Sequence, residues 1–438
     1  MKIKAIKNKL QSSLTAPRFL VLVNLMVAVI ALAQGLYVAR VLGASGYGYI
    51  GILVTISGIV SNFWDMRIND LAVRLHFKTE NNTRAQTANA IVSITINLIL
   101  GLFIACSSIL ACLLFWNYFT ETIPQTSWLA FQGIISGCGL MIGTVYTLQR
   151  LTENFFIFGT WKLITQLASL FLTMICLNIA PNIDGYYNGL LSSTLVGLSI
   201  ATCILIKEWN NKFTLTFSAK DLVEALKNYY KEIGFIFSAN FFSYSKMLSR
   251  SGDILLFGYF ANDSATGIYR LAKTLSDNLN IFTDALSQYY TPNYMKRMSV
   301  GDQHRMELSA KRLFIFAVYM TIIIIPTSYI SINLINTYIL NNLYPNLDIT
   351  TAIMMSNFIW FCGVHIWLWP SILHHNQMKK AATYSAIAAF VQLSLIAIFC
   401  YYFSPAPWLA AIASVIFYMM FYLPLLYWWK LTVLKKHL

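Results

Sequence analysis

The chain has 438 residues, of which 57% are hydrophobic and only 11% are charged, whereas an ordinary soluble domain is about one-quarter charged. With a mean hydropathy of +0.60, it has too little charge to cover the surface of a water-soluble protein of this length. The composition excludes a cytosolic enzyme, a secreted domain and a nucleic-acid binder, so the formal net charge of +14 is interpreted through membrane topology.

Apolar runs recur along the whole chain, each close to the ~20 residues that a membrane-spanning helix needs. They predict an all-α polytopic membrane protein with twelve transmembrane helices. The expected spans are residues 19–41, 47–66, 88–116, 126–149, 155–180, 185–206, 233–259, 264–290, 312–336, 350–373, 382–403 and 408–429.

Lysine and arginine residues orient these spans. With a cytoplasmic N-terminus, 25 of the 31 lysine and arginine residues lie in inside segments, and the outside loops contain none. The positive-inside rule therefore places both termini in the cytoplasm, and the inside cations also predict contact with anionic membrane lipids. The outside loops are short, and the chain has no HExxH, GxSxG or glycine-rich phosphate loop. We therefore expect a transporter, with no catalytic residue, metal or resident cofactor.

The chain also aligns with itself at an offset of 219 residues. Residues 36–65 match residues 255–284 at seven of thirty positions. Because six predicted helices separate the two copies, both copies cross the membrane in the same direction. This arrangement predicts two six-helix lobes related by a pseudo-two-fold axis along the membrane normal, with a cavity between them.

The repeat sets the expected domain boundaries. We expect an N-terminal lobe at residues 1–206, a linker at 207–232 and a C-terminal lobe at 233–438. Within the linker, Ser218 can cap a short helix that lies in the cytoplasmic interface. The apolar face of that helix is expected to carry Leu222, Leu226, Tyr229 and Tyr230.

Two sequence motifs resemble the polysaccharide biosynthesis flippases. These are the Wzx-type, or O-antigen, flippases of the multidrug/oligosaccharidyl-lipid/polysaccharide (MOP) exporter superfamily. The motifs are RSGDILLFGYF at 250–260 followed by ATGIYRLA at 265–272, and VLGASGYGY at 41–49. The family usually has glycines in the turn after the tenth span, whereas this chain reads HHNQMKK at 374–380. That departure leaves the cytoplasmic gate at this turn undefined.

The resemblance implies a function and its setting. An undecaprenyl-diphosphate-linked oligosaccharide, such as an O-antigen or capsule repeat unit, would be flipped across the bacterial inner membrane by alternating access. The resemblance further implies coupling to a proton or sodium gradient. A polysaccharide polymerase and a chain-length regulator are the expected protein partners.

Seven charged residues fall within two predicted spans. The seventh span holds Lys246, Arg250 and Asp253, and the eighth holds Arg270, Lys273, Asp277 and Asp284. At 100° per residue, each set falls within about 60° of arc, so the charges form one stripe on each helix. At ~1.5 Å per residue, Asp253 lies level with Arg270, and Lys246 with Asp277. We expect these two pairs to form, which leaves Arg250 and Lys273 without an acidic partner.

Two interpretations of these charges remain open. In one, they form a satisfied ion network that only holds the two spans together. In the other, they line a cavity that receives an anionic diphosphate. The candidate headgroup-binding residues are Arg250, Lys273, Lys246, Arg270 and Lys162. The candidates for ion coupling or charge pairing are Asp253, Asp277, Asp284 and its repeat-mate Asp65.

Two rival functions also remain open. A multidrug exporter would share the lobes and the orientation, but it would favour acidic residues that bind cationic drugs. The outer part of the expected cavity instead carries Arg250, Arg270 and Lys273 against Asp253, a net charge of +2. The second rival is a scaffold that transports nothing and recruits enzymes of glycan assembly. In that protein the charges would be purely structural.

Overall fold

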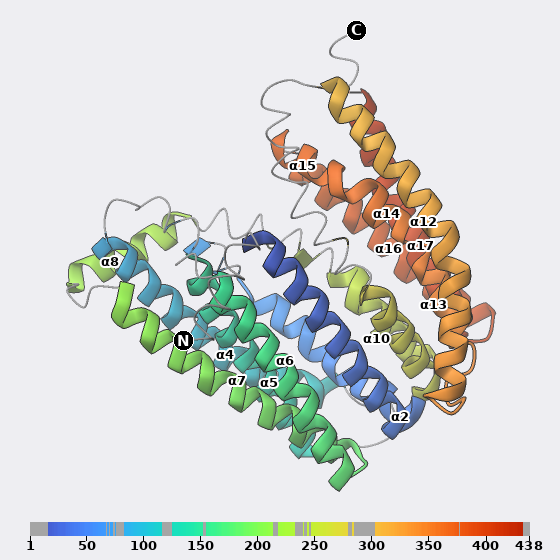
Figure 1. The fold of residues 1–438 in the computed structure, drawn as a ribbon, viewed down its shortest axis with the longest axis horizontal. Helices are drawn as coiled ribbons and strands as arrows, with labels where there is room; N and C mark the ends of the chain where they lie inside the picture. Colours follow the sequence, from blue (N-terminus) through green and yellow to red (C-terminus); the bar gives the residue numbers. More distant parts are fainter. Residues whose placement is uncertain are drawn as a thin grey trace, which may run out of the picture. The chain divides into compact units, whose positions relative to one another are not determined.

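The computed structural model describes residues 16–66, 68–69, 71–72, 75, 83–115, 125–151, 155–212, 218–232, 240, 243–244, 247–278, 283, 303–375 and 377–431. All regular secondary structure in these ranges is helical (Figure 1). Nine helices in the described ranges are long and apolar enough to cross a membrane. The all-α fold class is confirmed. The count of twelve spans stays a prediction, because the expected seventh and eighth spans lie partly outside the described residues.

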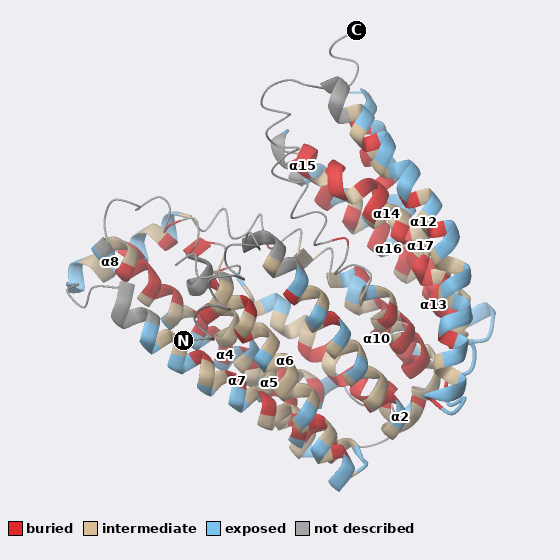
Figure 2. Ribbon diagram, viewed as in Figure 1, coloured by how far each residue is buried: buried red, intermediate tan, exposed pale blue. Residues whose placement is uncertain are grey.

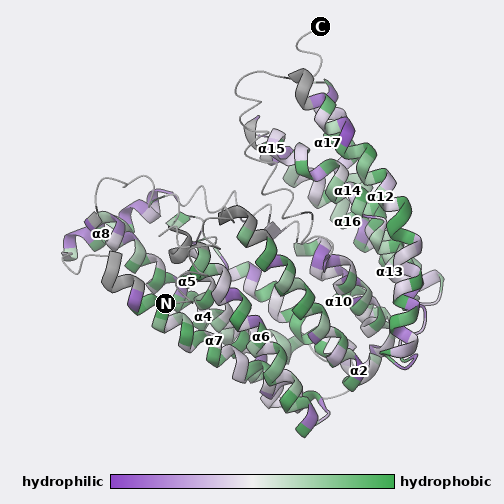
Figure 3. Ribbon diagram, viewed as in Figure 1, coloured by the Kyte–Doolittle hydropathy of each residue, from purple (hydrophilic) through white to green (hydrophobic). Residues whose placement is uncertain are grey.

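The long helices expose apolar side chains that a water-soluble bundle would bury. On α4 (Thr83–Phe115), Ile104 is buried whereas Leu102 and Phe103 are exposed. Figures 2 and 3 show the same on α12 (Gln303–Tyr338), whose exposed surface is largely hydrophobic. Surfaces of this kind are solvated by lipid chains, and the helices satisfy their own backbone hydrogen bonds there. The chain is a multi-pass membrane protein.

The chain forms two compact units. The first contains both ends of α2 (Ala16–Trp64) together with α4, α5 (Thr126–Leu151), α6 (Phe155–Ile179), α7 (Ile183–Lys212) and α8 (Ala219–Lys231). Residues 35–55, the middle of α2, belong to the second unit. The predicted domain boundaries at residues 206 and 233 stay a prediction.

Helix α2 contains the expected first and second spans. It is broken at Gly43, whose backbone angles are φ 68° and ψ 178°. A positive φ strains every residue with a Cβ atom, so glycine is the residue that allows the chain to turn here. The break falls between the predicted spans 19–41 and 47–66.

The second unit builds on a helical hairpin. A π-helical turn, η2 (Leu248–Gly252), leads directly into α10 (Asp253–Phe260), and a helix over 263–278 follows. The other elements are α12, α13 (Leu347–Met355), α14 (Phe358–Trp360), η3 (Phe361–His365), α15 (Ile366–His374), α16 (Met378–Tyr402) and α17 (Pro407–Trp429). The apolar core of this unit is richest where η3 and α15 to α17 pack together.

Gly48 and Gly267, which are repeat-mates, pack against each other within the second unit. A Cβ atom on Gly48 would lie 1.9 Å from the carbonyl oxygen of Asp263. A Cβ atom on Gly267 would lie 1.9 Å from the carbonyl oxygen of Ala44, the repeat-mate of Asp263. The contact is therefore reciprocal, as a local two-fold relation between the copies requires. Neither position has room for a side chain.

Helix α8 confirms the short helix predicted in the linker. Ser218 caps it, with a reciprocal hydrogen bond from the Ser218 backbone N–H to the Asp221 carboxylate at 2.8 Å. Its buried face includes Tyr229, whose hydroxyl donates to the carbonyl of Asn89 on α4 at 3.3 Å. Leu226 and Tyr230 are exposed, so the expected single apolar face is divided into a docked part and an exposed part. The position of α8 in the membrane interface stays a prediction.

Candidate functional site: an ion pair in a polar cavity

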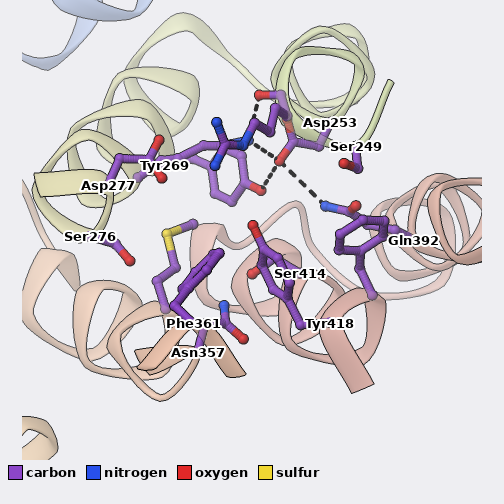
Figure 4. A pocket seen from close by; sticks show the side chains of 14 residues that line it. Ser249, Asp253, Tyr269, Ser276, Asp277, Asn357, Phe361, Gln392, Ser414 and Tyr418 are labelled. Atoms are coloured by element: carbon purple, nitrogen blue, oxygen red, sulfur yellow. Dashed lines mark hydrogen bonds and ion pairs between the residues drawn. The ribbon is translucent and has the colours of Figure 1, made fainter. Parts of the chain in front are cut away.

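A small cavity of about 30 Å³, lined by several polar side chains, lies inside the second unit (Figure 4). Its walls come from η2, α10, the helix over 263–278, α13, η3, α16 and α17, together with Asn357. The charged and polar residues that line it include Arg250, Asp253, Tyr269, Lys273, Asp277, Asn357, Gln392 and Tyr418. Four of the nine residues predicted to bind the headgroup or an ion therefore meet in one cavity.

Asp253 lies at the centre of this group. Its carboxylate is fully buried, with 0% of its surface exposed. Oδ1 accepts the backbone N–H of Ile254 at 2.7 Å. Oδ2 accepts the hydroxyl of Tyr269 at 2.7 Å and the side-chain amide of Gln392 at 3.4 Å, and it forms an ion pair with Lys273 (Figure 4). A buried carboxylate requires such donors, because an unpaired charge in a low dielectric is costly.

Lys273 is the cationic partner of Asp253, which corrects the sequence prediction. Its Nζ contacts Asp253 Oδ2 and also donates to the backbone carbonyl of Arg250 at 2.6 Å. The prediction that Lys273 lacks an acidic partner is therefore wrong. It lies about one helical turn deeper than Arg270, and its flexible four-carbon stem spans that difference.

Arg270 does not pair with Asp253, so that predicted pair is also wrong. Its Nη1 donates to the carbonyl of Tyr47 at 3.1 Å, and its guanidinium lies 4.9 Å from the centre of the Tyr47 ring. Gly51, one turn further along α2, leaves room for the side chain. Helical periodicity relates only the seventh and eighth spans to each other and gives no sign of a third neighbour. Arg270 turns instead toward residues 35–55 of α2, which offer an acceptor and an aromatic face.

Arg250 and Asp277 form the open side of the cavity. Both are exposed, and the Arg250 side chain hydrogen-bonds the hydroxyl of Tyr418. With Lys273 and Asp253, the cavity therefore has two cationic and two acidic residues, and its formal net charge is zero. The net charge of +2 expected for the outer part of a cavity between the lobes stays a prediction, because this cavity lies within the second unit.

Two π-helical turns border the cavity. Arg250 lies in η2, and Phe361 is the first residue of η3. A π-turn inserts one extra residue into a helix and is frequent at functional sites, because it turns a side chain away from the regular helical direction. The regular spacing of 100° per residue does not hold at η2, so side-chain directions there differ from those of the predicted stripe.

Two buried oxygens in the cavity wall lack a hydrogen-bond donor. Gln392 Oε1 and Asn357 Oδ1 have none, although these residues are only 1% and 4% exposed. The Nε2 atom of Gln392 already donates to Asp253, and this contact fixes the orientation of the amide. Sequence reasoning missed both residues. The only available signal was a polar side chain within an apolar span.

The first unit contains a neutral counterpart of this site. Gln34 and Thr173 are the repeat-mates of Asp253 and Gln392, and they make the equivalent contact, with Gln34 Nε2 donating to Thr173 Oγ1 at 3.0 Å. The Gln34 amide also contacts Ser169 Oγ at 3.0 Å. Both units therefore have a polar contact at the corresponding positions. Of the two contacts, only the one in the second unit includes a charged residue, Asp253.

Two other predicted site residues lie elsewhere in the described part of the chain, and two lie outside it. Lys162 lies in the first unit, where its Nζ donates to Asn24 Oδ1 at 2.8 Å. Asp65 follows the last residue of α2 and is half-buried. Lys246 and Asp284 lie outside the described residues, so the predicted pair of Lys246 with Asp277 stays a prediction.

Residues 18–289, well over half of the chain, match the family model for polysaccharide biosynthesis proteins. The chain belongs to this family. The resemblance based on the motifs at 41–49 and 250–272 is confirmed. No curated protein matches the sequence.

Several solved structures share the fold. An inward-facing multidrug resistance MATE family transporter of the MOP superfamily has a TM-score of 0.69 at 12% identity, covering 95% of this chain and 99% of that chain. The lipid II flippase MurJ in an inward closed conformation has a TM-score of 0.69 at 13% identity, covering 94% and 87%. A MOP superfamily transporter from Pyrococcus furiosus, described as having a binding pocket of reverse polarity, has a TM-score of 0.59 at 12% identity, covering 95% of both chains.

Proposed function

We propose that this protein flips an undecaprenyl-diphosphate-linked oligosaccharide from the inner to the outer face of a bacterial cytoplasmic membrane. The observation that carries the proposal is the family match over residues 18–289, because the family serves polysaccharide biosynthesis. The fold adds support, since a flippase of a lipid-linked precursor, lipid II, shares it. Such a protein moves its cargo by alternating access and performs no covalent chemistry.

The cavity suggests how an anionic headgroup is recognised. Arg250 is exposed at its open side and offers a planar guanidinium that matches two phosphate oxygens. Lys273 lines the same cavity, so its ammonium is a second candidate for the phosphate oxygens. Asp253 and Asp277 balance these cations when the cavity is empty of substrate. Coupling to an ion gradient would act on these carboxylates.

A multidrug exporter is the second candidate function. The formally neutral cavity in the second unit favours it, because a buried carboxylate, Asp253, lies at its centre and no excess of positive charge would repel a cationic drug. A multidrug resistance transporter also shares the fold. This function predicts export of cationic dyes that depends on Asp253.

A reconstitution experiment separates these functions. The purified protein in liposomes should move a fluorescent lipid-linked oligosaccharide to the opposite leaflet, read by quenching with an impermeant reductant. Empty liposomes and the Arg250→Ala variant are the controls. Transport of a cationic dye without movement of the lipid would favour the multidrug exporter. If the protein shows neither activity, the result would favour the scaffold.

The proposed orientation has its own test. We propose that both termini lie in the cytoplasm and that the protein lies in the inner membrane, where the polymerase and the chain-length regulator would be its partners. A cysteine at position 183, in a cysteine-free background, should react with an impermeant thiol reagent added to intact spheroplasts. A cysteine at position 215 should not react. Labelling at 215 would overturn the orientation.

A further inference from the structure

The Lys273 ammonium sits in surroundings that resemble a metal-cation site. Its Nζ contacts two oxygens, the Arg250 carbonyl at 2.6 Å and Asp253 Oδ2, and it lies 5.9 Å from the centre of the Tyr269 ring. A carboxylate and a backbone carbonyl are the hard oxygen ligands that alkali and alkaline-earth cations prefer. These two oxygens can bind either a lysine ammonium or a monovalent metal cation.

The same cavity holds two oxygen acceptors to which no residue in the described part of the chain donates. Gln392 Oε1 and Asn357 Oδ1 are buried, and no described residue donates to them. Both residues line the cavity: Gln392 lies beside Asp253, and Asn357 lies on the opposite wall (Figure 4). A buried oxygen without a donor costs free energy, and a cation or its water ligands would remove that cost. Two oxygens, Asp253 Oδ2 and the Arg250 carbonyl, contact the Lys273 ammonium directly, and the two amide oxygens line the same cavity.

We propose that Lys273 is a tethered cation that fills a monovalent-cation site on Asp253. Because the ammonium neutralises Asp253, the wild-type protein binds no Na⁺ at this position. Removing the ammonium leaves the buried carboxylate and the Arg250 carbonyl to bind Na⁺ in its place, with water in the cavity completing the coordination. The inference does not depend on which substrate is transported, because it concerns ion binding to the protein itself.

The test is thermal unfolding of the purified full-length protein in detergent, followed by the fluorescence of its 11 tryptophans. Each variant is measured in NaCl and in choline chloride at equal ionic strength. We expect the wild-type midpoint to be the same in both salts. We expect Lys273→Ala to unfold at a lower temperature in choline chloride, and to rise in NaCl with a shift that saturates as Na⁺ increases.

Two controls make the result specific. Lys273→Ala combined with Asp253→Asn should lose the response to Na⁺, because the carboxylate ligand is gone. Lys162→Ala is the matched control, since Lys162 is another intramembrane lysine but contacts the neutral Asn24. Its midpoint should not respond to Na⁺.

Three outcomes would overturn the proposal. The first is a saturable Na⁺ stabilisation of the wild type that Asp253→Asn removes. The second is a Lys273→Ala variant that unfolds at the same temperature in both salts. The third applies if Lys273→Ala folds poorly. If that variant fails to accumulate even in NaCl while the double variant with Asp253→Asn accumulates, Na⁺ does not bind the carboxylate that Lys273 leaves unpaired.

Discussion

The ion pair of Asp253 with Lys273 predicts an unequal double-mutant cycle. Asp253 is 0% exposed whereas Lys273 is 15% exposed. The two single variants should therefore lower the free energy of unfolding by different amounts. Lys273→Met leaves a fully buried carboxylate with only neutral donors, and we expect a loss near the about 3–5 kcal/mol typical of a broken buried pair. Asp253→Asn leaves an ammonium that keeps the Arg250 carbonyl and partial access to solvent, so we expect a loss of roughly 1–3 kcal/mol.

The double variant should be more stable than the sum of these losses allows. Removing both charges eliminates the unpaired ion, which makes joint neutralisation of a buried pair nearly neutral in other proteins. The assay is the unfolding midpoint of each variant in choline chloride, so that no metal cation substitutes for the lysine. Arg270→Gln is the control, because Arg270 contacts Tyr47 and should add independently to Asp253→Asn. Additive losses for Asp253 and Lys273, or coupling of Asp253 to Arg270, would refute the reasoning.

Three further predictions concern packing, binding and pH. Gly48→Ala should prevent normal accumulation in the membrane, because its Cβ would lie 1.9 Å from a carbonyl oxygen, whereas Gly58→Ala, with nothing within 4 Å, should accumulate as wild type on an immunoblot. Arg250→Ala should abolish glycan export at normal protein level, with Arg250→Lys partly active because it loses the planar fork; wild-type export in Arg250→Ala would contradict the headgroup assignment. Burial raises the pKa of Tyr229 to about 12, so its neutral form stabilises the docked α8 below about pH 10, and this contribution is lost as the pH rises through 12. A spin label on α8 should therefore become mobile over this range in wild type, and Tyr229→Phe should remove the pH dependence.

The fold was largely predictable because a bilayer imposes simple rules on sequence. Apolar runs of the right length mark the helices, and only a helix satisfies its own backbone in lipid. The capped helix α8 was predictable because its signal, Ser218 before an apolar pattern, is local. Its division into a docked and an exposed face was not, since that depends on α4 packing against one side.

The candidate site was predictable in its membership and not in its pairing. Helical periodicity placed Asp253 and Lys273 on facing stripes, and the structure brings them together. Arg270 was paired wrongly because its true neighbour, Tyr47, lies 223 residues away in sequence. Gln392 contacts Asp253 across 139 residues, and a single polar residue in an apolar span gives no indication of its partner.

Because Gly48 and Gly267 contact each other reciprocally, the same close packing restricts both positions to glycine. A side chain at either position would push apart the same two helical segments, because each glycine faces the backbone beside the other. Once a first substitution has separated them, a second meets open space, so the harm of the two changes should not add. Although the sequence is duplicated, neither copy can compensate for the other at this contact. A substitution in either repeat is enough to disrupt it.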